Sequence, residues 1–267
     1  MPVGVLQSAD FAIEPALPGG AFHGGFFTPS DSTGDIHKFT NGLAAACERL
    51  GVDMHMSTEV VSVSATGDGV TVVHRSTEPS LDGARAPEAV SGFDMVVICS
   101  GVQSRDLARS LGDRVNIYPV KGYSITVNLT DEISRASAPT VSLLDDETKL
   151  VSSRLGDDRF RVAGTAEFNG YNRDIRADRI RPLVEWVNQC FPGVNTRSVV
   201  PWAGLRPMMP NMMPKVGRGS SPCVFYNTGH GHLGWTLSAI TADMVGDVVA
   251  QSLGRPAPVA SGQTAVA

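Results

Sequence analysis

Positive charge is not in excess in this sequence. It has 22 Lys and Arg residues against 27 Asp and Glu residues, which gives a net charge of −5 at pH 7. The basic residues are scattered along the chain and form no cluster. Because nucleic-acid binding depends on gathered positive charge that neutralises phosphates, we expect no nucleic-acid partner.

Long hydrophobic runs are lacking as well. No apolar stretch approaches the ~20 residues that span a bilayer. The first residues, MPVGVLQSADFAIEP, have neither a basic start nor an apolar run of signal-peptide length. We therefore expect a soluble, cytoplasmic protein.

Cysteine is scarce and unpaired. The residues Cys47, Cys99, Cys190 and Cys223 lie far apart, and no two of them form a C-x-x-C pair. Each has apolar neighbours, so we expect all four to be small buried side chains rather than reactive groups. We also expect no metal site.

Hydrophobic residues, by contrast, make up 42% of the 267 residues, enough for one large core or two smaller ones. Apolar residues recur at steps of three and four in residues 36–50, which predicts an amphipathic helix with Asp35 or Thr33 as its cap. Alternating segments at 59–64 and 70–74 predict a hairpin. Residues 95–99, MVVIC, are apolar on both faces, as is typical of a strand buried in a parallel sheet.

The pattern changes after residue 116. Four segments have strand character and one has helical periodicity, which indicates an antiparallel sheet with a helix: 117–129, 140–144, 149–153, 159–168 and 178–191. Prolines and methionines then alternate through residues 202–219, and we expect a loop there because the prolines exclude a helix. A short strand at 223–226 and a helix at 237–249 follow.

Between these last two elements, Gly229-His230-Gly231-His232-Leu233-Gly234 spells G-x-G-x-x-G. A dinucleotide fingerprint also needs a second strand that ends in an acidic residue about twenty residues later, and only the tail follows here. A metal site would need a third ligand near the two histidines. Two interpretations stay open: a tight turn without a ligand, or a glycine turn that passes close to an anionic or electron-rich group.

Six segments, in the same order, resemble the FAD-dependent amino-acid oxidoreductases, and within them the small subunit of bacterial D-amino-acid dehydrogenases. They are TPSDSTGDIHKFTNGLAAACERLGV, VVICSGVQS, YPVKGYSITV, VAGTAEFNGYN, WAGLRPMMPNMMPKVG and YNTGHGHLGWTLS. The resemblance implies an α/β (α+β) fold: a partial, Rossmann-like FAD-binding domain with an inserted antiparallel substrate domain. Nothing before Gly19 resembles the family's ADP-binding unit, so we expect that N-terminal segment to be lacking.

The resemblance also implies domain limits and site residues. The expected FAD-binding domain comprises residues 1–116 and a return segment, 216–251, with the substrate domain at 117–215 and a tail at 252–267. Arg206 would bind the substrate carboxylate, and Tyr123, near Lys121, would lie beside the substrate. The residues expected to contact FAD are Val60 at the adenine, Gly101 at the pyrophosphate, and Gly229, Gly231, His232, Leu233 and Gly234 at the flavin.

The implied activity is oxidative deamination of a D-amino acid to a 2-oxo acid and ammonia, by hydride transfer to the flavin of FAD. The resemblance further implies a quinone or another respiratory electron acceptor, and peripheral association with the inner face of the cytoplasmic membrane. Two alternatives stay open: an oxidase of glycine or another small amine, and a non-catalytic fragment that binds a partner.

Overall fold

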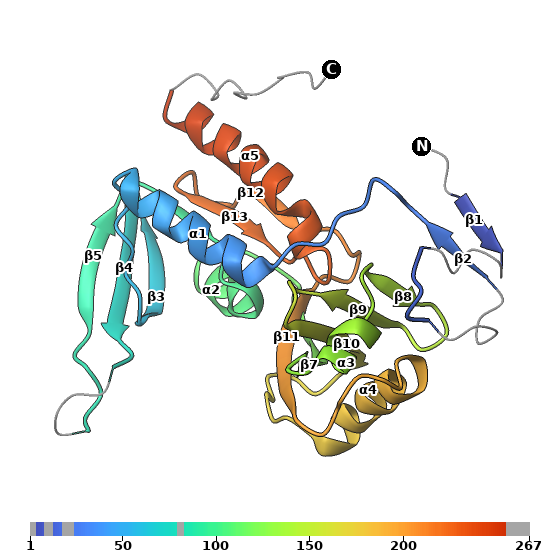
Figure 1. Ribbon diagram of the computed structural model, residues 1–267. Coiled ribbons are helices and arrows are strands. Elements are labelled where there is room, and N and C mark those ends of the chain that lie inside the picture. The colour runs from blue at the N-terminus through green and yellow to red at the C-terminus, as the bar shows by residue number, and fades with distance from the viewer. Residues whose placement is uncertain (1–3, 8–12, 18–23, 79–82, 255–267) are drawn as a thin grey trace. The chain divides into compact units, whose positions relative to one another are not determined.

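The computed structural model describes residues 4–7, 13–17, 24–78 and 83–254 (Figure 1). The expected α/β (α+β) class is confirmed: five α-helices among the described residues accompany mostly antiparallel strands. The chain forms two compact units. Unit 1 combines Met1–Ala46 with Val120–Leu205, and unit 2 combines Cys47–Pro119 with Arg206–Ala267. The domain limits expected from the sequence stay a prediction, and the expected tail lies outside the described residues from residue 255 onward.

Unit 1 is built on a five-stranded antiparallel sheet. Its order is β11, β7, β10, β9, β8. The strands are β7 (Tyr118–Asn128), β8 (Leu143–Asp145), β9 (Leu150–Arg154), β10 (Arg159–Glu167) and β11 (Val199–Met208). A short pair, β1 (Gly4–Gln7) with β2 (Gly24–Phe27), and the helices α3 (Glu132–Ser137) and α4 (Ala177–Cys190) belong to the same unit. The antiparallel sheet with one long helix was predicted from the sequence and is confirmed.

One face of this sheet is covered by α4 (Figure 1). Phe160 and Val162 of β10 and Leu183 of α4 are fully buried in the core between them. Phe191, just after α4, packs edge-on against Phe160 with ring centroids 5.5 Å apart. The side chains between these apolar positions therefore point to the other face, because neighbouring residues of a strand alternate.

Helix α1 (Ile36–Arg49) begins where the sequence predicts. Asp35 Oδ1 accepts hydrogen bonds from the backbone N–H groups of His37 at 3.1 Å and Lys38 at 3.2 Å, as an N-cap residue does. The helix is followed by Gly51, whose φ of +87° suits a helix C-terminus.

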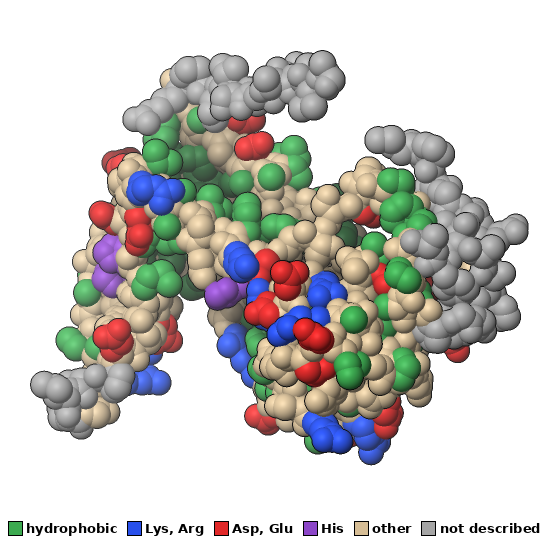
Figure 2. Space-filling view, viewed as in Figure 1, with side chains coloured by type: hydrophobic (Ala, Val, Ile, Leu, Met, Phe, Trp, Pro, Cys, Tyr) green, Lys and Arg blue, Asp and Glu red, His purple; other side chains and the backbone are tan. Residues whose placement is uncertain are grey.

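Unit 2 contains two three-stranded sheets. An antiparallel meander joins β3 (Thr58–Thr66), β4 (Gly69–Ser76) and β5 (Ala89–Phe93), and contains the predicted hairpin. The other sheet has the order β12, β13, β6, from β6 (Val96–Ile98), β12 (Lys215–Arg218) and β13 (Val224–Thr228). The 3-10 turn η1 (Gly101–Gln103), α2 (Ser104–Ser110) and α5 (Gly234–Ser252) complete the unit. Ile240 and Met244 of α5 are exposed apolar residues. In the space-filling view, hydrophobic side chains lie among polar ones in the part of the molecule that contains α5 (Figure 2).

Three predictions from the sequence are wrong. The strand expected at residues 95–99 is not buried on both faces, because Val97 of β6 is 38% exposed. Residues 202–219 are not a single loop, because β11 runs through Pro201 and Pro207 and β12 begins at Lys215. The predicted loop is limited to residues 209–214 between these strands. β11 is an edge strand of its sheet. Proline has no N–H group to donate, and an edge strand tolerates it because one side of the strand has no neighbouring strand that needs this donor. The cysteines are not all buried either: Cys190 and Cys223 are, whereas Cys99, just past the end of β6, is exposed.

Candidate functional site

The candidate site lies where two parallel strands of unit 2 end together. Strands β6 and β13 pair in parallel, with Ile98 opposite Tyr226. Each strand runs into a glycine turn, at Gly101 with a φ of +57° and at Gly229 with a φ of +81°. Thr228 joins the turns, since its hydroxyl donates to the carbonyl of Gly101 at 3.3 Å. Open α/β sheets bind ligands at this edge, beyond the carboxyl ends of parallel strands.

Two glycines of the second turn are required by their backbone and by their neighbours. Gly229 and Gly231 have φ values of +81° and +58°, which side chains with a Cβ rarely adopt. A Cβ on Gly229 would lie 2.7 Å from Met209 Cγ, and a Cβ on Gly231 would lie 2.7 Å from Met208 Sδ. The turn therefore passes close beneath two methionine side chains, which no spacing in the sequence had indicated.

Helix α5 begins directly after this turn. Its N-cap residue, Leu233, supplies no side-chain hydrogen bond to the first turn of the helix. His232 is exposed and Leu233 is 40% exposed, so this end of the helix is open to a ligand. Uncapped N–H groups at a helix N-terminus attract anionic or electron-rich groups. The predicted residues His232, Leu233 and Gly234 thus lie together, at the start of α5.

Strand β11 meets the same turn. The backbone N–H of Gly231 donates to the carbonyl of Pro207 at 3.0 Å, and Met208 forms an isolated antiparallel bridge with His230. Arg206, which is partly buried, immediately precedes this contact. The predicted carboxylate-binding residue therefore lies in the strand that touches the glycine turn.

His230 is a residue to which the sequence gave no role. Its Nε2 lies 3.1 Å from the hydroxyl of Thr241, a buried residue of α5. Burial lowers the pKa of the His230 imidazole, so the ring is held as a neutral group at pH 7. This hydrogen bond ties the turn to the second turn of the helix and fixes the path of the backbone.

Asn227 carries an unsatisfied polar atom in the same strand. Its side-chain oxygen, Oδ1, is buried and accepts no hydrogen bond from any residue that the structure describes. A buried acceptor without a donor costs about 1–3 kcal/mol. Asn227 lies in β13, two residues before Gly229 and the glycine turn.

Val60, the predicted adenine contact, lies in the other sheet of unit 2. It is 44% exposed and pairs with His74 of β4, next to a bulge between Val60 and Ser62. Helix α2 approaches this strand, where the hydroxyl of Ser110 lies 3.5 Å from the carbonyl of Val63. The role of Val60 stays a prediction.

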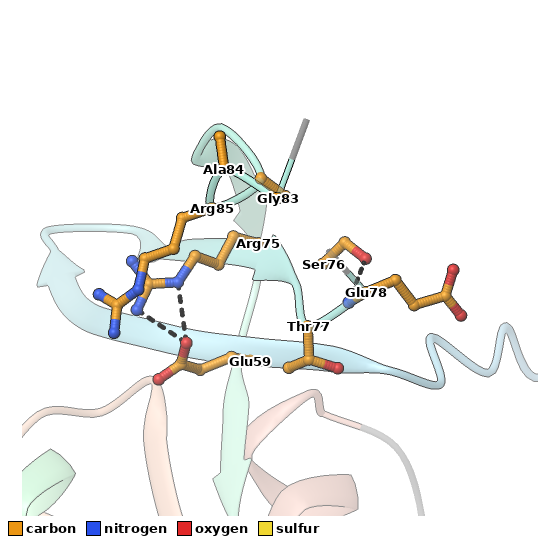
Figure 3. Close-up of a pocket in the computed structure, with 9 residues that line it drawn as sticks. Glu59, Arg75, Ser76, Thr77, Glu78, Gly83, Ala84 and Arg85 are labelled. Carbon is orange, nitrogen blue, oxygen red and sulfur yellow. Dashed lines mark hydrogen bonds and ion pairs between the residues drawn. The ribbon is translucent and has the colours of Figure 1, made fainter. Parts of the chain in front are cut away.

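A pocket of about 250 Å³ also lies in this sheet (Figure 3). Arg75 lies within it, 2.8 Å from Glu59 and 3.3 Å from Glu88. These carboxylates neutralise its charge, and none of the predicted site residues lines the pocket. We therefore do not place the functional site there.

Tyr123 and Lys121 lie in unit 1, in a buried polar cluster. The hydroxyl of Tyr123 donates to Glu167 Oε2 at 2.5 Å, and Lys121 Nζ lies 3.6 Å from the same oxygen. Lys121 also donates to Asn172 Oδ1 at 3.0 Å and to the carbonyl of Asp174 at 3.1 Å. The side chains of Tyr123 and Lys121, which both belong to β7, are almost fully buried.

The hydrogen bond between Tyr123 and Glu167 favours a protonated phenol and an ionised carboxylate. Burial raises the pKa of Tyr123, and the hydrogen bond to Glu167 raises it further, so the phenol stays protonated. The same bond lowers the pKa of Glu167, which stays a carboxylate. The hydroxyl of Tyr123 is therefore engaged in a structural bond, and its catalytic role stays a prediction.

Within the described parts of the chain, no three His, Cys, Asp or Glu side chains gather as metal ligands would. In those same parts, no helix has the length and apolar character needed to cross a bilayer.

Comparisons with known proteins agree on one family. Residues 3–248 match the family described as FAD dependent oxidoreductase. D-amino acid dehydrogenase 3 of Mesorhizobium japonicum is 56% identical over 249 residues, which are 93% of this chain and 58% of that protein. D-amino acid dehydrogenase of Paramagnetospirillum magneticum is 42% identical over 251 residues, 93% of this chain and 55% of that protein. The chain thus spans somewhat more than half the length of these relatives.

Solved structures show the same fold. Glycine oxidase from Geobacillus kaustophilus superposes with a TM-score of 0.79 at 22% identity, over 94% of this chain and 63% of that one. L-proline dehydrogenase from P. horikoshii gives 0.77 at 15% identity, over 97% of this chain and 67% of that one. The fold, the length of the matched segment and the identity to the curated relatives lead to one conclusion: the chain belongs to the family of FAD-dependent oxidoreductases.

Proposed function

We propose that the chain is part of an FAD-dependent dehydrogenase that oxidises D-amino acids to 2-oxo acids and ammonia. The observation that carries the proposal is the hydrogen bond from Gly231 N–H to Pro207 O, because it joins the strand of Arg206 to the glycine turn. A substrate-binding arginine and a cofactor-binding turn need to be neighbours if both act on one substrate. The 56% identity to a relative named D-amino acid dehydrogenase supports the choice of substrate.

The residues at the ends of β6 and β13 fit FAD. Gly101 and Gly229 allow a ligand to approach the backbone closely, because neither has a Cβ. The open N-terminus of α5 provides N–H groups to the electron-rich edge of a flavin. The unsatisfied Oδ1 of Asn227 can accept a hydrogen bond from an N–H or O–H group of the cofactor. Val60 would contact the adenine in this proposal.

In the proposed reaction, the guanidinium of Arg206 binds the carboxylate of the substrate through two parallel hydrogen bonds. That pairing would fix the Cα–H bond relative to the glycine turn. When bound, FAD would supply the acceptor for the hydride that leaves Cα. The nitrogen lone pair would form the C=N bond of an imino acid, which water hydrolyses. The chain contributes mainly positioning and positive potential, and the mechanism assigns no side-chain base.

The electron acceptor in this proposal is a quinone or another respiratory carrier. Such an acceptor would place the protein at the inner face of the cytoplasmic membrane, attached peripherally. This part rests on the family resemblance of the sequence.

The test uses a chimera in which this chain is joined to the part of the Mesorhizobium japonicum relative that it does not match. We expect reduction of a dye acceptor with D-alanine and none with L-alanine. Arg206→Met should raise KM for D-alanine roughly 10- to 100-fold, since a charge-assisted pair is lost. The exposed Arg197 is the matched control, and Arg197→Met should leave KM unchanged.

Three results would contradict the proposal. Stoichiometric hydrogen peroxide without dye reduction would indicate an oxidase, which the sequence left open. A folded chimera that consumes no D-amino acid would favour the non-catalytic alternative. An unchanged KM in Arg206→Met would remove this arginine from the site.

A further inference from the structure

Three side-chain hydroxyls of unit 2 form a hydrogen-bonded series between the two glycine turns, which we call the hydroxyl network. The hydroxyl of Ser100 lies 3.1 Å from that of Ser104, which lies 2.8 Å from that of Thr228. Thr228 donates in turn to the carbonyl of Gly101 at 3.3 Å. Ser104 begins α2 and Thr228 ends β13, so the network joins segments 124 residues apart in the sequence.

The direction of these hydrogen bonds follows from the carbonyl at the end of the network. A carbonyl oxygen has no proton and can only accept, so the proton of Thr228 points to Gly101. The oxygen of Thr228 then accepts from Ser104, and the oxygen of Ser104 accepts from Ser100. Ser104 and Thr228 therefore each donate one bond and accept another, which an apolar side chain of the same shape cannot do.

The two central hydroxyls are shielded from water. Ser104 is fully buried, and Thr228 is 2% exposed. Water therefore cannot take the place of a partner that is removed, and the remaining polar group would be left unpaired. The backbone N–H of Ser104 also donates to the carbonyl of Gly101, so this one oxygen receives bonds from both ends of the Ser104–Thr228 pair.

The network lies where the strand pairing stops. β6 and β13 are paired as far as Ile98 and Tyr226. Past these residues, the hydroxyls of Ser104 and Thr228 connect the Gly101 turn to the residue that precedes the Gly229 turn. Both glycines have a positive φ, which leaves the path of each turn dependent on such contacts.

We infer that Ser104 and Thr228 are positioning residues for the cofactor, because they fix the Gly101 turn and the Gly229 turn at the separation that FAD needs. The inference rests on the proposed function, in which both turns contact FAD. The two buried hydroxyls act through the backbone of the turns and need no contact with the cofactor.

The test measures the dissociation constant of FAD for the cofactor-free chimera, by quenching of flavin fluorescence. Thr228→Val keeps the shape of the side chain and removes its hydroxyl, so FAD should bind roughly 5- to 30-fold more weakly. Thr228→Ser keeps the hydroxyl and should bind FAD nearly as well as the wild type. Ser104→Ala should weaken binding as well, and the double variant should lose less than the two single losses combined, since both act on one network.

Ser134 of unit 1 provides the control for a purely structural role. It is 1% exposed, its hydroxyl donates to Asp131 Oδ2 at 2.8 Å, and it accepts from the backbone N–H of Asn195 at 3.0 Å. Ser134→Ala should lower the urea midpoint of unfolding, as Thr228→Val does, and leave the dissociation constant of FAD unchanged.

Hydrogen–deuterium exchange of the full chain tests the same idea without cofactor. Thr228→Val should speed the exchange of backbone amides in residues 99–104 and in residues 228–234, because both turns lose their connection. Faster exchange in residues 228–234 alone would mean that the hydroxyl serves only its own strand, and would overturn the inference.

Three results of the FAD titration would also overturn it: wild-type affinity in Thr228→Val, no recovery in Thr228→Ser, or a chimera that binds no FAD. If Thr228→Val does not fold, wild-type affinity in Ser104→Ala has the same meaning. Dye reduction with D-alanine tests the proposed function separately. A chimera whose FAD affinity depends on Thr228 and which oxidises no D-amino acid would refute the proposed function and leave the inference on the turns in place.

Discussion

Replacement of Gly229 by Ala gives a direct test of why the glycine turn has its sequence. The φ of +81° at this position lies in the left-handed region, and the new Cβ would lie 2.7 Å from Met209 Cγ and 3.3 Å from Met209 Sδ. Ile117 Cγ1, at 3.7 Å, would be in ordinary contact. Two separate costs therefore apply, one to the backbone and one to the methionine.

Both costs can be bounded. A non-glycine residue in the left-handed region costs about 1–2 kcal/mol. Met209 must also move away from the new methyl group, and an off-rotamer side chain costs about 0.5–1.5 kcal/mol. We expect Gly229→Ala to lower the free energy of unfolding by roughly 2–3 kcal/mol.

A second glycine in unit 2 provides the control with the opposite sign. Gly246 lies inside α5, and a Cβ there would meet nothing within 4 Å. Gly246→Ala should raise the free energy of unfolding by about 0.5–1 kcal/mol, because Ala loses less backbone entropy in a helix. The same chemical change should thus have opposite effects at the two positions.

Urea unfolding monitored by far-ultraviolet circular dichroism checks this prediction. The midpoints of the two variants should lie on either side of the wild-type value, with similar slopes. A Gly229→Ala protein that unfolds at the wild-type urea concentration would refute the reasoning, because the turn would then accept a Cβ without strain.

Three further predictions concern unit 1. Tyr123→Phe removes the donor to Glu167 Oε2, and the free energy of unfolding should fall by about 1–2 kcal/mol in urea; no fall would mean that the bond contributes nothing. Arg159 lowers the pKa of Asp35, so this carboxylate stabilises the fold above its unfolded pKa of about 3.9 and loses that effect as the pH falls through its folded pKa. Arg159→Met should therefore lose less stability than the wild type between about pH 5 and pH 3, measured as urea midpoints; parallel pH profiles would contradict this. Glu14 is buried and accepts bonds from several backbone N–H groups, so Glu14→Ala should cost about 2–4 kcal/mol; a thermal midpoint equal to the wild type would disprove this role.

Much of the fold could be predicted because its signals are local. The helical periodicity before residue 50, the capping Asp35 and the hairpin around Gly67 all depend on residues close in sequence. The strand at 96–98 was recognisable by its composition, and its parallel partner β13 lies more than a hundred residues away. Composition therefore indicated that a parallel neighbour exists and left its identity open.

The wrong predictions have a common physical cause: they depend on contacts between residues that are distant in the sequence. Pro207 forbids a helix, yet it is compatible with a strand that has a neighbour on one side, and the sequence does not say which strand is at the edge. Cys99 has apolar neighbours in sequence, and its exposure depends on where β6 ends. The contacts of the two methionines with the glycine turn are equally non-local. The same holds for the hydrogen bond between His230 and Thr241, and for the pairing of β11 with the turn.

Residues 229–234 match the G-x-G-x-x-G pattern, but the structure requires a glycine at only two of its three glycine positions. Gly229 and Gly231 are required by positive φ and by the methionines above them. Gly234 has no left-handed φ, and a Cβ there would lie 3.6 Å from His230 Cβ, which is ordinary contact. In a dinucleotide fingerprint the third glycine is needed for close packing of helix and strand. Here an alanine would fit, and no strand follows α5 within the described residues. Two glycines shape the turn in this protein, and the third satisfies the pattern without a steric reason.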